Sequence, residues 1–206
     1  MSNRLKVSRV PAYSFAFFVL LFSTLPAHAH LNSTGMGPVY DGLMHFLMSP
    51  EDFIPVLALA FFAGLRGASF SRRTLFVLPA AWFLGGLVGL YSSTWNGNAI
   101  VSSLWLLLLG GLLAFNARPS IHVITGLAAL LGVYHGYING AGMGEPRTAL
   151  IAMLGLAFAV FVLAALASAF VVRLQAEWAR IAVRVAGSWI AATGLLMTGW
   201  ALRRGG

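Results

Sequence analysis

The 206-residue sequence contains no cysteine and little charge. The absence of cysteine excludes disulfide bonds, zinc–thiolate sites and thiol nucleophiles. Charged residues make up 9% of the chain, whereas a soluble domain carries about 25%. A chain that is 59% hydrophobic, with a mean hydropathy of +0.85, has too few charges to cover a water-facing surface. These shortages exclude an ordinary cytosolic enzyme, a disordered protein and a nucleic-acid binder, and they indicate an all-α integral membrane protein.

Acidic residues are also scarce, with five Asp and Glu against 13 Lys and Arg. A basic balance often indicates nucleic-acid binding. Here, however, the basic residues lie at the ends of apolar runs, which is typical of loops that flank a membrane. The sequence contains no P-loop, GxSxG or HExxH motif, and no serine in the glycine context of a rhomboid-like protease. We therefore expect a protein that is not an enzyme and binds no nucleic acid.

The N-terminal segment 1–29 is predicted to be a cleavable secretory signal. Its start carries the basic residues Arg4, Lys6 and Arg9, and an apolar stretch follows at residues 13–25. Ala27-His28-Ala29 then gives the small-x-small pattern of a signal-peptidase cleavage site. The apolar stretch is too short for a span of about 20 residues. An uncleaved first anchor is the alternative. Cleavage would leave His30 at the mature N-terminus, where its amine and imidazole could chelate a metal together.

The remaining chain, residues 30–206, is predicted to be a single polytopic helical domain. A helix crosses the hydrocarbon core with about 20 residues and pairs its own backbone groups there. Charge-free stretches predict about six spans, with Arg72 and Arg73 forming the break between the first two. The expected spans are approximately 50–68, 74–92, 98–117, 121–140, 148–173 and 178–203.

The distribution of arginines predicts the orientation. Cytoplasmic loops carry an excess of Lys and Arg, and a start on the outer side places seven arginines inside against three outside. We therefore expect the protein in the cytoplasmic (inner) membrane, with the mature N-terminus on the outer, periplasmic side. Arg180 and Arg184, one helical turn apart, are interpreted as lipid-facing anchors whose charged ends reach the membrane surface.

A short segment, Pro38 to Met48, precedes the first span and is too short to cross the membrane. We interpret it as a half-helix that dips in from outside. In such a helix Asp41 and His45, spaced i and i+4, would share one face. Ser49 and Asp52 then fit a capping box at the start of the first span, which is one explanation for the carboxylates of Glu51 and Asp52.

The predicted topology gathers imidazoles and carboxylates on the outer side. Ionisable groups at membrane depth are costly and usually functional, and this mixture of donors suits a divalent cation. A structural hydrogen-bonding role for His135 is the alternative. A stripe formed by Gly132, Gly136 and Gly140 would allow close helix packing beside it. The candidate metal-binding residues are His30, Asp41, His45, Glu51, Asp52, His135 and Asn139.

Two motifs in this group resemble those of the HupE/UreJ hydrogenase and urease accessory membrane proteins. Gly42 to Asp52 resembles the family pattern G-x-x-H-P-x-x-G-x-D-H, and Tyr134 to Gly140 resembles the start of F-H-G-x-A-H-G-x-E. The final glutamate of the second pattern has no counterpart at its usual spacing, although Glu145 is nearby. This chain departs from the patterns at Glu51-Asp52, which stands for Asp-His, and at Asn139, which stands for the second histidine. The resemblance implies a signal peptide, about six helices and a nickel permease. The lost imidazoles shift the preference toward oxygen ligands, or toward no metal at all.

The expected function is therefore permease-like handling of a divalent transition-metal ion, with nickel favoured and cobalt or copper as alternatives. The alternative is a non-transporting accessory protein of a metalloenzyme system, which would need only the polar outer side. The inner halves of the predicted spans are poor in polar groups, and this favours the alternative over transport. Copper handling through Met44, Met48 and His45 is a third interpretation. The expected partners are the lipid bilayer, the metal ion and metalloenzyme-maturation proteins, and no permanently bound cofactor is expected.

Overall fold

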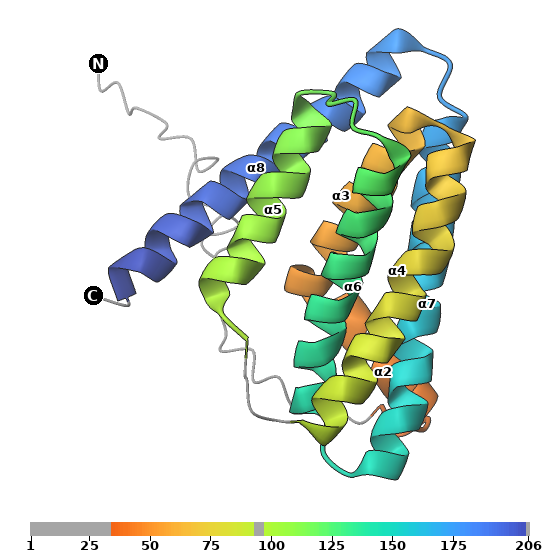
Figure 1. The fold of residues 1–206 in the computed structure, drawn as a ribbon, viewed down its shortest axis with the longest axis vertical. Helices are drawn as coiled ribbons and strands as arrows, with labels where there is room; N and C mark the ends of the chain where they lie inside the picture. The colour runs from red at the N-terminus through yellow and green to blue at the C-terminus, as the bar shows by residue number, and fades with distance from the viewer. Residues whose placement is uncertain (1–33, 93–96, 205–206) are drawn as a thin grey trace, which may run out of the picture.

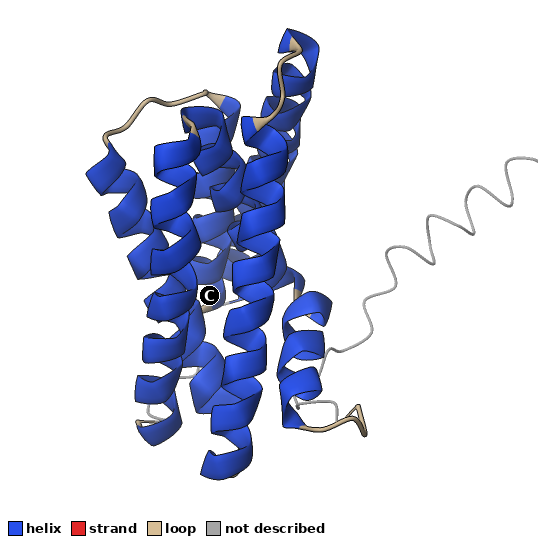
Figure 2. Cartoon of the chain, turned by 90° about the vertical axis from the view of Figure 1, so that its right-hand side faces the viewer, coloured by secondary structure: helices blue, strands red, loops and turns tan. Residues whose placement is uncertain are grey.

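The computed structural model describes residues 34–92 and 97–204, and every regular element within these ranges is an α-helix (Figures 1 and 2). The predicted signal segment 1–29 and His30 lie outside the described residues. The helices are α2 (Pro38–Met48), α3 (Pro50–Arg66), α4 (Ala68–Tyr91), α5 (Ala99–Ala114), α6 (Ile121–Gly142), α7 (Pro146–Val172) and α8 (Glu177–Arg204).

Four of these helices, α4, α6, α7 and α8, are long and apolar enough to cross a membrane. Helices α2 and α3 meet at an angle of 76° and would add a fifth span if they are counted together. Helix α5 has 16 residues, which is shorter than the about 20 residues of a full crossing. The expected helical membrane protein is thus supported, whereas the number of six spans stays a prediction.

The half-helix predicted from Pro38 to Met48 is present as α2 with these bounds. It packs against α7 at two glycines. A Cβ atom on Gly42 would lie 1.8 Å from the Ala152 carbonyl oxygen, and one on Gly155 would lie 2.1 Å from the Val39 carbonyl oxygen. Only glycine permits this approach, which holds α2 across the end of α7 and positions His45.

The elbow between α2 and α3 lies at Ser49, which has extended backbone angles and is followed by Pro50 at the first helical position. The predicted capping box is wrong, because the Ser49 side chain makes no capping hydrogen bond. The carboxylate of Asp52 is instead turned toward α6. A buried carboxylate gains more from partners inside the bundle than from a cap, since its desolvation must be compensated there.

Helix α3 forms the centre of the bundle (Figure 1), where it packs against α7, α5 and α4. Val56, Leu59 and Phe62 are fully buried. Helices α4 and α6 run side by side through closely approaching glycines. Cβ atoms on Gly136 and Gly140 would each lie 2.0 Å from a carbonyl oxygen of α4. This contact fixes the rotation of α6 and therefore the direction of its polar side chains.

Two helix boundaries differ from the prediction. The break after α3 lies at Gly67, with φ +112°, and not at Arg72-Arg73, which are exposed inside α4. Arginine is a good helix former, so the charges of Arg72 and Arg73 do not end a helix. Helix α3 ends at Gly67 because this residue has a backbone conformation that only glycine adopts readily. Helix α5 ends at Ala114 rather than 117, because Asn116 adopts φ +50°.

Helix α8 pairs with α5 (Figure 1), and its first two turns contact helix ends. A terminal nitrogen of Arg180 donates to the Leu65 carbonyl at 3.1 Å, and Nε of Arg184 donates to the Ala114 carbonyl at 3.2 Å. The interpretation of these arginines as lipid-facing anchors therefore misses one contact, because each also binds a helix end inside the bundle. The last carbonyls of α3 and α5 lack intrahelical partners, and cationic donors satisfy them.

Candidate functional site

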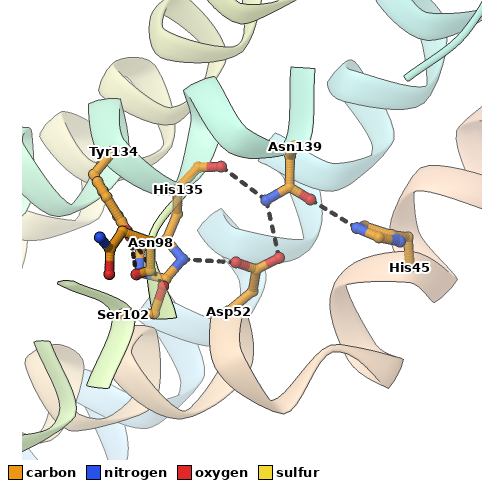
Figure 3. A network of polar contacts seen from close by, with 7 residues as sticks. All are labelled: His45, Asp52, Asn98, Ser102, Tyr134, His135 and Asn139. Atoms are coloured by element: carbon orange, nitrogen blue, oxygen red, sulfur yellow. Dashed lines mark hydrogen bonds and ion pairs between the residues drawn. The ribbon is translucent and has the colours of Figure 1, made fainter. Parts of the chain in front are cut away.

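Asp52 lies at the centre of a buried polar network that joins three helices (Figure 3). Its Oδ1 lies 2.7 Å from Nδ1 of His135, and its Oδ2 accepts a hydrogen bond of 2.9 Å from Nδ2 of Asn139. Asp52, His135 and Asn139 are all buried. The Asp52–His135 pair is the one close contact between a carboxylate and a basic side chain in residues 34–92 and 97–204. An isolated carboxylate would be very costly at this depth, so its two partners are essential to the arrangement.

Asn139 extends the network to α2 and determines the proton positions in it. Its Nδ2 also donates to the His135 carbonyl at 2.8 Å, so both amide hydrogens are used. The Oδ1 atom must then accept from Nε2 of His45, which lies 2.7 Å away. In the neutral tautomer that fits this contact, His45 carries its proton on Nε2, and Nδ1 is unprotonated.

His135 is held in the corresponding way. Its Nδ1 faces a carboxylate oxygen and carries a proton, while its Nε2 is buried without a hydrogen-bond partner. The ring stacks on Trp82 with a centroid distance of 5.4 Å, and Tyr134 meets it edge-on at 5.0 Å. The Tyr134 hydroxyl lies 3.0 Å from Oγ of Ser102, which ties the site to α5. The imidazole is thus fixed by one stacked ring, by one edge-on ring and at one nitrogen.

A cavity of about 90 Å³ adjoins this network. His45, Asp52 and Asn139 line it together with Glu51 and Met143. Glu51 is exposed and Asp52 is buried, so the two carboxylates are arranged from the surface inward. The cavity can hold a small cation with part of its hydration shell, but no larger organic substrate.

One of the predicted ligands, Asp41, lies outside this network. The Asp41 carboxylate accepts hydrogen bonds from the Thr34 backbone N–H at 2.5 Å and the Thr34 hydroxyl at 2.7 Å. It lines a separate cavity of about 310 Å³ with Glu145 and Thr148. Asp41 and His45 belong to the same helix, as predicted, but their side chains bind different partners. His30 lies outside the described residues.

The structure therefore brings together His45, Asp52, His135 and Asn139, with Glu51 at the edge of the cavity. In the described parts of the chain, no three or more His, Asp or Glu side chains form a ready metal-binding group. Hydrogen bonds join His45 to Asn139, and they join His135 and Asn139 to Asp52. A cation that enters the cavity would therefore compete with these hydrogen bonds for the imidazole nitrogens and the carboxylate oxygens.

Sequence reasoning missed the aromatic groups around His135. Trp82 lies inside a long apolar run, where its pattern cannot be distinguished from core packing. Tyr134 directly precedes His135, and this position is the one local signal that could have identified it. The contact with Ser102 could not be found in this way, because it depends on how α5 sits against α6.

The sequence also matches a known protein family. The family model described as "HupE / UreJ protein" matches residues 18–197, which include the whole network and most of the chain. The chain belongs to the HupE/UreJ family. No curated protein and no solved structure gave a match.

The two HupE/UreJ-like motifs form the two halves of the site. The first motif, Gly42 to Asp52, forms α2 and the elbow into α3, and the second, Tyr134 to Gly140, lies on α6 against α4. Asp52 and Asn139 stand where the family patterns have histidines, and in this chain they bind each other. The two departures are thus one structural feature, in which a carboxylate–amide pair connects the motifs.

Proposed function

We propose that this HupE/UreJ protein is a non-enzymatic, permease-like membrane protein that captures a divalent transition-metal ion, with nickel favoured. The observation that carries this proposal is the buried His45–Asn139–Asp52–His135 network beside a small cavity in a helical membrane bundle. Buried ionisable groups in a membrane domain are retained for function far more often than for stability. The metal ion is the cargo, and no resident cofactor is proposed.

The chemistry of the cavity favours a cation of intermediate hardness. The imidazole of His45 and the carboxylates of Asp52 and Glu51 line it, and such mixed sites suit nickel, cobalt or copper. A cation beside Asp52 would also offset the desolvation of this carboxylate. Glu51 would attract the ion at the surface, and His45 and Asp52 would bind it below.

A non-transporting accessory role is the second candidate, and the packing of α3 favours it. Beyond Asp52 the centre of the bundle is filled by fully buried apolar side chains, including Val56, Leu59 and Phe62. A permease would need a second conformation that opens a polar path past these residues. An accessory protein that binds metal, or a metalloenzyme-maturation partner, on its outer side would need none.

The proposed topology has six spans, with the elbow on the outer side of the inner membrane and a signal peptide removed after residue 29. The absence of cysteine makes the orientation easy to test. Glu145→Cys and Gln175→Cys introduce single thiols at exposed positions in loops at opposite ends of the bundle. A membrane-impermeant maleimide should label the first in intact cells and the second only after lysis, and the reverse pattern would overturn the orientation.

The function is tested by accumulation of radiolabelled nickel in cells that express the wild type, His45→Ala or Asp52→Asn, with cobalt and copper in parallel. His122→Ala is the matched control, because this histidine is exposed at the opposite end of α6. We expect uptake with the wild type and the control and its loss in both site variants at equal expression. Nickel binding by purified protein without uptake would support the accessory role, and neither binding nor uptake would refute metal handling.

A further inference from the structure

Four arginines lie at one end of the bundle, which is the upper end in Figure 1. This end is opposite the buried polar network of His45, Asp52, His135 and Asn139. Arg66 ends α3, Arg118 lies in the connection between α5 and α6, and Arg180 and Arg184 occupy the first turns of α8. We call these four residues the arginine cluster. Segments far apart in the sequence supply them, so only the fold brings them together.

Hydrogen bonds hold three of the four members of the cluster in place. The Arg66 guanidinium donates to Oδ1 of Asn116, two residues before Arg118. Arg180 donates to the Leu65 carbonyl, which is adjacent to Arg66, and Arg184 donates to the Ala114 carbonyl. The charges of Arg118 and Arg180 lie close enough to Arg66 to repel it. The fold thus orders positive side chains side by side against their mutual repulsion.

This positive charge has no carboxylate partner. Within residues 34–92 and 97–204, no arginine forms an ion pair with Asp or Glu, and Nε of Arg66 is buried without a hydrogen-bond partner. Glu177, at the start of α8, is the acidic residue at this end of the described chain, and it is exposed. Each guanidinium carries five N–H donors, and the contacts with Asn116 and the carbonyls use few of them.

We propose that the arginine cluster binds a phosphate group, supplied either by the headgroup of an anionic phospholipid or by free phosphate. Guanidinium groups bind phosphate oxygens through paired, charge-assisted hydrogen bonds. Basic pockets between membrane helices at the surface of the bilayer bind anionic headgroups in this way. The bound phosphate would join the ends of α3 and α8 to the α5–α6 connection and relieve the repulsion between the arginines.

The test measures thermal unfolding of the full-length protein in a neutral detergent with added phosphatidylglycerol, phosphatidylcholine or inorganic phosphate. The test variant is Arg66→Gln with Arg180→Gln. The control is Arg72→Gln with Arg73→Gln, which removes the same charge from exposed positions near the same end of the bundle. We expect phosphatidylglycerol to raise the midpoint temperature of the wild type and the control more than phosphatidylcholine does, and the test variant to lose most of this difference.

An equal effect of inorganic phosphate at millimolar concentration identifies free phosphate as the source, and an effect of the lipid alone identifies the headgroup. Arg118→Gln provides a second test if the double variant does not fold, because Arg118 is exposed. This variant should also reduce the difference between the lipids. Equal effects of both lipids on the wild type, with none from phosphate, would overturn the proposal. An equal loss in the control variant would overturn it too, because the response would then depend on charge alone.

Discussion

Replacing Gly136 by alanine tests whether the close contact between α4 and α6 builds the site. A Cβ atom at this position would lie 2.0 Å from the Trp82 carbonyl oxygen and 2.8 Å from its carbonyl carbon. Real Cβ atoms essentially never come within 3.0 Å of such atoms. Both groups belong to helix backbones, so no side chain can rotate away, and the helices must separate by roughly 1 Å or more.

The expected magnitude follows from overpacking, which costs about 1–3 kcal/mol in a well-packed core. Alanine also gains about 1 kcal/mol of helix propensity over glycine, and this gain must be subtracted. Gly126→Ala supplies the correction, since Gly126 lies on the same helix and its Cβ would have nothing within 4 Å. We expect Gly136→Ala to be less stable than Gly126→Ala by about 1–3 kcal/mol.

The assay is unfolding of both purified variants by denaturing detergent, together with nickel binding. Separation of α6 from α4 would also move His135 and Asn139 away from Asp52, so the proposed nickel binding should be weaker in Gly136→Ala and unchanged in Gly126→Ala. Equal stability of the two glycine variants would refute the inferred contact. Lower stability with unchanged nickel binding would show that the contact supports the fold but not the metal site.

Three further predictions concern single residues. Asn139→Ala should destabilise the protein by about 2–5 kcal/mol, because it leaves Asp52 with one partner and His45 with none; unfolding of the variant, compared with His122→Ala, measures this loss. Gly67→Ala should cost about 1–3 kcal/mol, because φ of +112° disfavours a side chain, and Gly111→Ala, inside α5 with open space around it, should instead stabilise the protein by up to about 1 kcal/mol. Arg184→Gln should cost about 0.5–1.5 kcal/mol through loss of its bond to the Ala114 carbonyl; an equal loss in Arg203→Gln would contradict this explanation.

The sequence by itself determined the helical membrane character of the chain and the approximate limits of its helices. Hydropathy and glycine or proline signals act over neighbouring residues, so they can be detected without a fold. The half-helix from Pro38 to Met48 was predictable for this reason, because it is apolar, too short to cross and closed by Ser49-Pro50. The same local patterns identified His45, His135 and Asn139 as candidate site residues, since polar groups in apolar runs are conspicuous.

Only the tertiary structure decided which of these residues meet. Asp52 reads locally as a helix cap, yet it binds residues 83 and 87 positions away, and His45 meets Asn139 across 94 positions. Arg180 and Arg184 read as lipid-facing, yet they bind the ends of α3 and α5. The physical reason is the same in both cases. A polar side chain in a membrane bundle binds the partner that best offsets its desolvation. The close glycine contacts set the separation and rotation of the helices, and they therefore determine which partners lie within reach.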